Sequence, residues 1–103
     1  MDKYNIQYSK ESVDDLRNIY AYICFNLSSP DNAVKKIEKI KKAVRTLDTF
    51  PNGHPTVEYE HWDKLNVHRL PLDNCIIFYQ IEEEQHQVYT FRIFYKGKTS
   101  DNN

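Results

Sequence analysis

The stretch Cys75-Ile76-Ile77-Phe78-Tyr79-Gln80-Ile81 is apolar at nearly every position, which predicts a strand at the centre of the fold. On its C-terminal side, the acidic loop at residues 82–87 separates this strand from a second apolar run at residues 88–95. On its other side, a turn at residues 71–74 separates it from the run at residues 65–70. Connections this short demand antiparallel pairing, so the second half of the chain predicts three consecutive antiparallel strands.

The first half of the chain predicts one strand and two amphipathic helices. Apolar and polar residues alternate over residues 4–8, which is typical of a short strand. Apolar residues then recur every three or four positions over residues 10–27, and again from Pro30 to the break Phe50-Pro51-Asn52-Gly53. These apolar positions are Val13, Leu16, Ile19 or Tyr20, Ile23 and Leu27 in the first helix, and Ala33, Ile37, Ile40, Val44 and Leu47 in the second.

Two helices joined by so short a break form an antiparallel hairpin, and neither has an apolar face broad enough to stand alone. We therefore predict an α+β fold: an N-terminal strand, an antiparallel two-helix hairpin and three antiparallel strands, with the helices on one face of a small sheet. A length of 103 residues fits a single domain, residues 1–103. Ser9 and Ser12 are equally good N-caps of the first helix, and Ser12-x-x-Asp15 resembles a capping box.

Composition excludes several classes of function. Only two glycines occur, so no phosphate-cradling loop is expected, and the longest apolar run, residues 19–25, is far short of a membrane span. Cys24 and Cys75 have no partner motif and are interpreted as buried thiols, and the four histidines share no metal-ligand spacing. We expect no cofactor, no metal and no membrane. The start of the chain lacks the apolar core of a signal peptide, so the expected location is cytoplasmic.

Charged residues near one end of the predicted sheet form a candidate anion site. Arg92 and Arg69 each lie in the middle of a predicted strand, where a guanidinium must be paired, solvated in a concavity or available to an anionic partner. With Tyr95 and Lys98 at the strand end, they are candidates for binding a phosphate and stabilising its charge. The alternative is that both arginines form structural ion pairs with acids such as Glu58, Glu60 or Asp73.

Alternation along the strands predicts which side chains share a face of the sheet. In the last strand it places Val88, Thr90, Arg92 and Phe94 on one side and Tyr89, Phe91, Ile93 and Tyr95 on the other. In the central strand it places Ile76 and Phe78 opposite Cys75, Ile77, Tyr79 and Ile81. Both faces are therefore apolar. The helices bury one, and the other is either a partner site or is covered by a loop or by strand curvature.

The second predicted helix carries a basic run. A solvated helix face is one interpretation, because these positions complement the apolar stripe; contact with an acidic partner or a nucleic-acid backbone is the other. The formal net charge of the chain, −1, does not favour general electrostatic binding of nucleic acid. The basic residues are Lys35, Lys36, Lys39, Lys41, Lys42 and Arg45.

The order and spacing of several short pieces resemble the RelE/ParE superfamily of bacterial toxins from type II toxin–antitoxin systems, with the hairpin and the stretch from Arg69 to Phe78 closer to the ParE branch. The resemblance covers nearly the whole chain. After the early strand, the pieces are Asp14-Asp15-Leu16-x-x-Ile19-Tyr20-x-Tyr22-Ile23, Leu47-x-x-Phe50-Pro51, Val67-His68-Arg69-Leu70, Asp73-Asn74-Cys75-Ile76-Ile77-Phe78-Tyr79-Gln80-Ile81 and Phe91-Arg92-Ile93-Phe94-Tyr95.

The resemblance implies a small growth-inhibiting toxin that a cognate antitoxin holds inactive by covering its hydrophobic surface. Operator DNA would be contacted only through the antitoxin. RelE-type toxins cut messenger RNA in the ribosome, whereas ParE-type toxins poison DNA gyrase without catalysis. The residues expected to bind the partner are Ile76, Phe78, Val88 and Phe94.

Three departures weaken the nuclease interpretation. RelE-type nucleases carry an arginine early in the strand where this chain has Ile76, and they are rich in lysine and arginine, whereas this chain is nearly neutral. After the last strand, Lys98 matches the basic position of the family, but Thr99 replaces its acid.

Three hypotheses follow: a ParE-like toxin that binds gyrase, a RelE-like ribosome-dependent endonuclease, and an inactive relative that retains only antitoxin binding. In a nuclease, Arg69 and Arg92 would hold the phosphate with help from Lys98, and Tyr95 would transfer protons. His68 is a weaker candidate for proton transfer, because adjacent residues of a strand point to opposite faces. In a gyrase poison the same residues would be target contacts.

Overall fold

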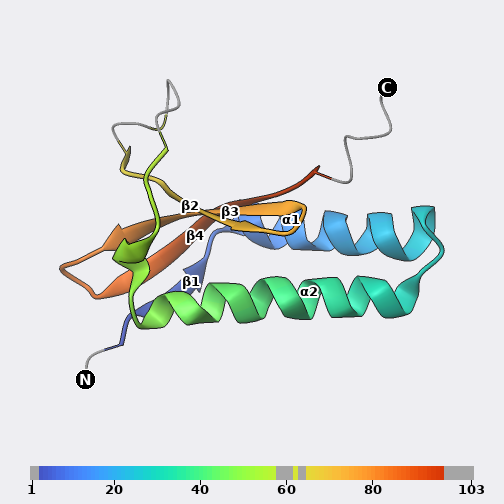
Figure 1. Cartoon of the computed structure of the whole chain (residues 1–103), viewed down its shortest axis with the longest axis horizontal. Helices are drawn as coiled ribbons and strands as arrows, with labels where there is room; N and C mark the ends of the chain where they lie inside the picture. The colour runs from blue at the N-terminus through green and yellow to red at the C-terminus, as the bar shows by residue number, and fades with distance from the viewer. Residues whose placement is uncertain (1–2, 58–61, 63–64, 97–103) are drawn as a thin grey trace.

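The computed structural model describes residues 3–57, 62 and 65–96. It contains a four-stranded sheet in the order β1-β4-β3-β2. The strands are β1 (Asn5–Tyr8), β2 (His68–Leu72), β3 (Cys75–Glu82) and β4 (Gln87–Tyr95). β2, β3 and β4 are antiparallel as predicted, and β1 pairs in parallel with β4. The predicted α+β class and element order are confirmed (Figure 1).

The strand β2 lies further along the chain than the sequence pattern predicted. It continues through Pro71 to Leu72, so the turn shrinks to Asp73 and Asn74. Pro71 is tolerated because β2 is an edge strand, where its missing N–H leaves no ladder bond unmade. Asp73 has a φ of 53°, a left-handed conformation that Asp adopts more readily than most residues.

Two helices form the predicted hairpin and cover one face of the sheet. They are α1 (Lys10–Ala21), continued by a π-helical turn, η1 (Tyr22–Asn26), and α2 (Pro30–Arg45). Ser9 is the N-cap of α1, and its Oγ accepts the backbone N–H of Ser12 at 2.9 Å. None of the helices in the described part of the chain has the length and apolar content needed to cross a lipid bilayer.

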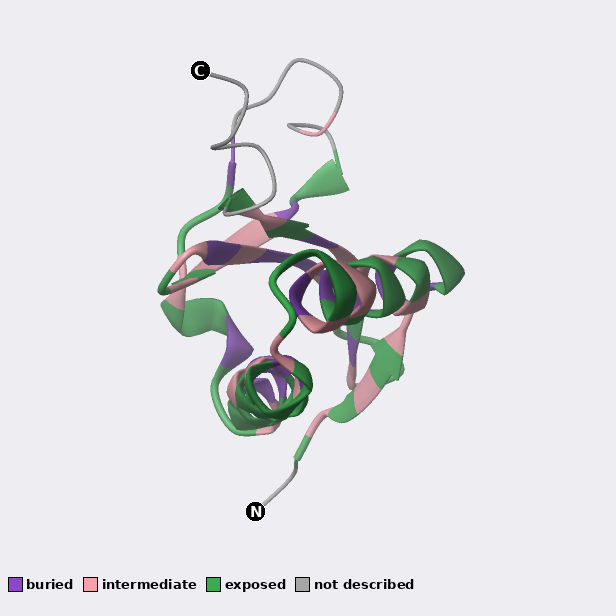
Figure 2. Ribbon diagram, turned by 90° about the vertical axis from the view of Figure 1, so that its right-hand side faces the viewer, coloured by how far each residue is buried: buried purple, intermediate pink, exposed green. Residues whose placement is uncertain are grey.

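The core lies between the helices and the sheet (Figure 2). Cys75 is buried in it and Cys24 packs half-buried against it. Leu27, predicted as part of the buried stripe, is instead 52% exposed. The reason is η1, in which the N–H of Leu27 bonds the carbonyl of Tyr22, five residues earlier, and so shifts the helical period. The buried core residues shared by helices and sheet are Leu16, Ile19, Ile23, Ala33, Ile40, Val44, Cys75, Ile77 and Ile93.

The face of the sheet away from the helices is covered in part by the segment that precedes β2. Val57, Trp62 and Val67 pack against Phe78, which is only 1% exposed. The ring of Trp62 lies 5.0 Å from that of Phe78 and 5.1 Å from that of Phe91. Of the two possibilities left open for this face, a loop covers its centre, and the exposed apolar surface is reduced to its end.

Candidate functional site

A β-bulge in β4 decides which way the candidate residues point. Phe78 of β3 lies opposite Arg92, but the next residue, Tyr79, lies opposite Thr90, so Phe91 is the extra residue. The predicted strict alternation is therefore wrong for β4. Before the bulge, Val88 and Thr90 face the helices; after it, Ile93 and Tyr95 do.

Arg69, Phe78 and Arg92 form one row across β2, β3 and β4. Side chains opposite each other in a ladder share a face, so both arginines lie on the face away from the helices, on either side of the buried Phe78 ring. Two strand spacings separate their backbones, roughly 10 Å.

Arg92 is held by Asp15, a residue that the sequence pattern had assigned to a capping box. The Arg92 Nε–H donates to Asp15 Oδ2 at 2.8 Å, and its Nη2 donates to Oδ1 at 3.0 Å. The same carboxylate accepts the backbone N–H of Ile93 at 2.9 Å. The hydrogen bonds to Asp15 raise the pKa of Arg92. The alternative of a structural ion pair is therefore correct for Arg92, with Asp15 in place of the predicted acids.

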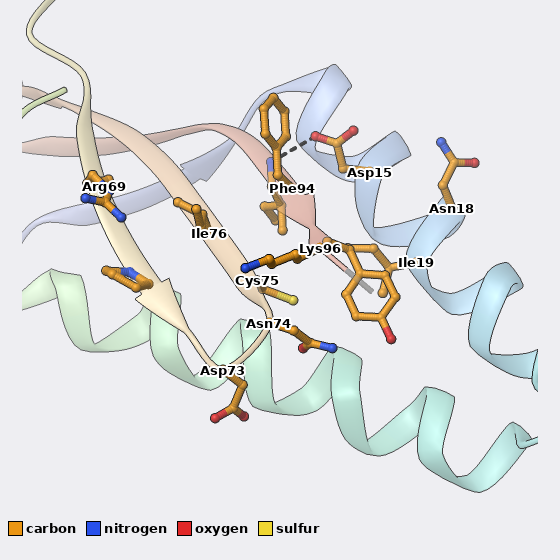
Figure 3. A pocket seen from close by; sticks show the side chains of 13 residues that line it. Asp15, Asn18, Ile19, Arg69, Asp73, Asn74, Cys75, Ile76, Phe94 and Lys96 are labelled. Atoms are coloured by element: carbon orange, nitrogen blue, oxygen red, sulfur yellow. Dashed lines mark hydrogen bonds between the residues drawn. The ribbon is translucent and has the colours of Figure 1, made fainter. Parts of the chain in front are cut away.

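The Arg69 guanidinium makes no hydrogen bond or ion pair with another residue in the described part of the chain, although the backbone N–H of Arg69 donates to the carbonyl of Pro55 at 3.0 Å. It lines a groove of about 580 Å³ at the end of the sheet, which we call the sheet-end groove (Figure 3). Glu58 and Glu60, which the sequence pattern offered as its partners, lie outside the described residues, as does Lys98. The third, Asp73, is paired with Lys39, and the hydrogen bond from Lys39 lowers the pKa of Asp73.

The sheet-end groove combines apolar and cationic surface. Ile76 and Phe94 lie side by side on β3 and β4, with Phe94 43% exposed, and Arg69 and Lys96 add positive charge. The groove is lined by Asp15, Asn18, Ile19, Arg69, Pro71, Asp73, Asn74, Cys75, Ile76, Ile93, Phe94, Tyr95 and Lys96. Arg92 is not among them. This lining suits a partner segment that places an anionic group beside an apolar side chain.

Tyr95 lies on the opposite face of the sheet from Arg92. Its ring packs against the helical core, 6.0 Å from the ring of Tyr22, and the Nζ of Lys36 lies 5.9 Å from its centre. His68 is also remote, because it stacks on Tyr79 at 5.2 Å and its Nδ1 donates to the carbonyl of His54 at 2.7 Å. The candidate residues therefore do not converge on one point: Arg69 and Tyr95 line the groove, whereas Arg92 borders it, held by Asp15 and lying 5.2 Å from the centre of the Phe94 ring.

Of the four residues predicted to bind the partner, two are buried and two are accessible. Val88 is fully buried between Leu47 and Tyr79, and Phe78 lies under Trp62. Ile76 and Phe94 remain accessible in the sheet-end groove. Within residues 3–57, 62 and 65–96, no three His, Cys, Asp or Glu side chains gather as metal ligands would.

Comparison with known proteins identifies the family of this chain. A family model described as the ParE toxin of a type II toxin–antitoxin system, parDE, matches residues 6–98. No curated protein sequence matches the chain.

Two solved structures share the fold. The chromosomal ParDE toxin–antitoxin system from P. aeruginosa superposes with a TM-score of 0.74 at 20% identity, over 89% of this chain and 95% of that chain. The toxin–antitoxin complex RelBE2 from Mycobacterium tuberculosis superposes with a TM-score of 0.68 at 12% identity, over 90% of this chain and 98% of that chain.

Proposed function

This chain belongs to the ParE toxin family of type II toxin–antitoxin systems, and we propose that it inhibits bacterial growth by binding DNA gyrase, without catalysis. The observation that carries the proposal is the separation of the groups that a nuclease would need together. Arg92 is clamped by Asp15 on the outer face, whereas Tyr95 packs among the helices on the inner face. A binding surface needs no such convergence.

The sheet-end groove is the proposed point of contact with gyrase. Arg69 supplies a cation that is not neutralised by any described residue, beside the apolar Ile76 and Phe94. An interface of this composition resembles binding hot spots, where an arginine and aromatic rings contribute most of the affinity.

A cognate antitoxin is the second proposed partner. The two solved structures compared above are a ParDE toxin–antitoxin system and a RelBE2 toxin–antitoxin complex. We propose that the antitoxin covers Ile76 and Phe94 and so blocks the groove from the target, and that operator DNA is contacted only through the antitoxin. The family match over residues 6–98 supports a single toxin domain. Because gyrase acts on cytoplasmic DNA, we propose that the toxin acts in the cytoplasm.

A supercoiling assay with purified gyrase tests the proposal. The purified chain is expected to inhibit ATP-dependent supercoiling of relaxed plasmid, and Arg69→Ala to weaken inhibition at least about 10-fold, the loss typical of a hot-spot residue. Arg17→Ala is the matched control, because Arg17 is an exposed arginine on α1, outside the sheet-end groove. Unchanged supercoiling, together with cleavage of messenger RNA on ribosomes, would overturn the proposal in favour of the RelE-like nuclease.

A further inference from the structure

The tip of the helical hairpin presents two large apolar side chains to solvent. Phe25 is 73% exposed and Leu27 is 52% exposed, whereas Ile23 beside them is only 4% exposed. The π-helical turn η1 explains the exposure of Leu27, because in a regular helix Leu27 would lie on the same face as Ile23. Such turns are rare and occur frequently at functional sites. The tip also projects beyond the end of the sheet (Figure 1), where a large partner can reach it.

A groove with basic walls begins at this tip. It measures about 520 Å³, and we call it the lysine groove. Ile23, Leu27 and Tyr95 supply its apolar surface, and α2 supplies three lysines, Lys35, Lys36 and Lys39.

The lysine groove has a surplus of positive charge. No acid is among its lining residues in the described part of the chain. Lys36 donates to the side-chain oxygen of Asn74 at 2.7 Å, and Lys39 pairs with Asp73 at the edge, where both side chains are more than half exposed. Lys35 forms no ion pair with a described residue. An exposed pair such as Lys39–Asp73 contributes little stability and leaves Lys39 accessible to a partner.

We propose that the lysine groove and Phe25 are a second part of the target-binding surface, and that they receive an acidic segment of the target protein. This inference rests on the proposed function. The matching segment carries carboxylates opposite Lys35 and Lys39 and an apolar side chain that contacts Leu27. Tyr95 lines both the sheet-end groove and the lysine groove, so the two surfaces are continuous.

The occupant is a protein and not a nucleic-acid backbone, because exposed apolar side chains gain from burial only against an apolar surface. The antitoxin, in contrast, is proposed to bind only in the sheet-end groove. Substitutions in the lysine groove are therefore expected to reduce toxicity without reducing neutralisation by the antitoxin.

The test compares single variants of the full chain in three measurements: affinity for purified gyrase, growth arrest on induction, and co-purification with the cognate antitoxin. Phe25→Ser, Leu27→Ser and Lys35→Glu are expected to lose at least about 10-fold in gyrase affinity and to lose growth arrest, while antitoxin binding is kept. Two controls are expected to stay within about twofold of wild type. Phe50→Ser removes a side chain that is 68% exposed and follows the C-terminal end of α2. Lys41→Glu reverses the charge of a residue that does not line the groove.

Each outcome decides something different. Wild-type affinity and growth arrest in Phe25→Ser and Leu27→Ser would overturn the inference. A loss of gyrase affinity confined to Lys35→Glu would also overturn it if a DNA or RNA oligonucleotide causes the same loss by competing with gyrase for the wild-type chain. If the wild-type chain arrests growth but does not bind gyrase, the proposed function fails. The groove is then still tested, because its variants must lose arrest.

Discussion

The carboxylate of Asp15 on α1 accepts two hydrogen bonds from the Arg92 side chain and one from the backbone N–H of Ile93. The last of these satisfies a backbone donor at the edge of β4. β1 pairs with β4 only as far as Thr90. Beyond that point Ser9 takes over, with its Oγ donating to the carbonyl of Phe91 at 2.8 Å, and Asp15 follows. The Asp15–Arg92 pair therefore replaces a missing neighbouring strand and fixes α1 against the sheet.

The first prediction concerns this pair. Asp15→Ala should destabilise the fold by roughly 2–3 kcal/mol, because it leaves Arg92 without its partner and the Ile93 N–H without an acceptor. Arg92→Ala should cost less, about 1–2 kcal/mol, because the Arg92 side chain is 37% exposed and the Ile93 bond survives. Urea unfolding measures the free energy of unfolding of both variants.

The control is Arg17→Ala, because the partner of Arg17, Asp14, is exposed and lies 3.8 Å away. The expected loss of stability is at most about 0.5 kcal/mol. Equal, small losses for all three variants would show that the clamp contributes nothing.

The second prediction concerns Thr90, which is fully buried and whose hydroxyl has no hydrogen-bond partner among the described residues. Thr90→Val replaces this hydroxyl with a methyl group of similar shape. It should stabilise the fold by about 1 kcal/mol, because an unsatisfied buried hydroxyl is costly. Thr46→Val on the exposed end of α2, where the hydroxyl donates to the carbonyl of Ala43 at 2.6 Å, should not stabilise. A loss of stability in Thr90→Val, read from thermal unfolding, would mean that the hydroxyl is satisfied.

The third prediction concerns alkaline pH. Burial raises the pKa of Tyr79, whose hydroxyl donates to the carbonyl of Pro51 at 2.5 Å. In the folded protein, the hydroxyl of Tyr79 therefore stays protonated at a pH where the same hydroxyl is ionised in the unfolded protein. Stability from Tyr79 is fully present below about pH 10, the ordinary pKa of tyrosine, and falls above it by up to about 1.4 kcal/mol per pH unit.

Urea unfolding between pH 9 and pH 11 measures this slope. Tyr79→Phe should make the slope shallower, although it lowers stability at neutral pH by breaking the bond to Pro51. Tyr89→Phe, at a position that is 40% exposed, should leave the slope as it is. Identical slopes for wild type and Tyr79→Phe would contradict the assignment.

The fourth prediction separates binding from catalysis at Tyr95. Tyr95→Phe keeps the ring that packs against Tyr22 and removes only the hydroxyl. A gyrase-binding toxin should keep its potency within about threefold, whereas a nuclease that uses this proton should lose on the order of 10²-fold or more. Growth arrest after graded induction gives the comparison.

Much of the fold could be predicted because each element carries its own local signal. The apolar run of β3 and the short turns on either side require antiparallel strands, and two 3.6-residue stripes separated by Pro30 require a helical hairpin. The predictions for Leu27 and Val88 were wrong, because Leu27 is exposed and Val88 is buried on the face opposite Phe94. A π-helical turn and a β-bulge each shift the period by one residue, and neither carries a reliable signature in a single sequence.

The candidate site was predicted less completely, because it depends on contacts between distant parts of the chain. Asp15 lies 77 residues before Arg92, and its local pattern suggested only a helix cap. Likewise, the covering of Phe78 by Trp62 depends on how the segment before β2 folds back over the sheet. Arg69 and Tyr95 were identified and do line one groove, although they lie on β2 and β4, which β3 separates.

Gyrase binding without catalysis is tested by inducing the chain in a bacterium that lacks the antitoxin and measuring plasmid superhelicity and new messenger-RNA 5′ ends in the same culture. A gyrase-binding toxin predicts growth arrest, relaxed plasmid and intact messages. Fresh 5′ ends inside translated codons with unchanged superhelicity would contradict the account and make Arg69 and Tyr95 catalytic candidates.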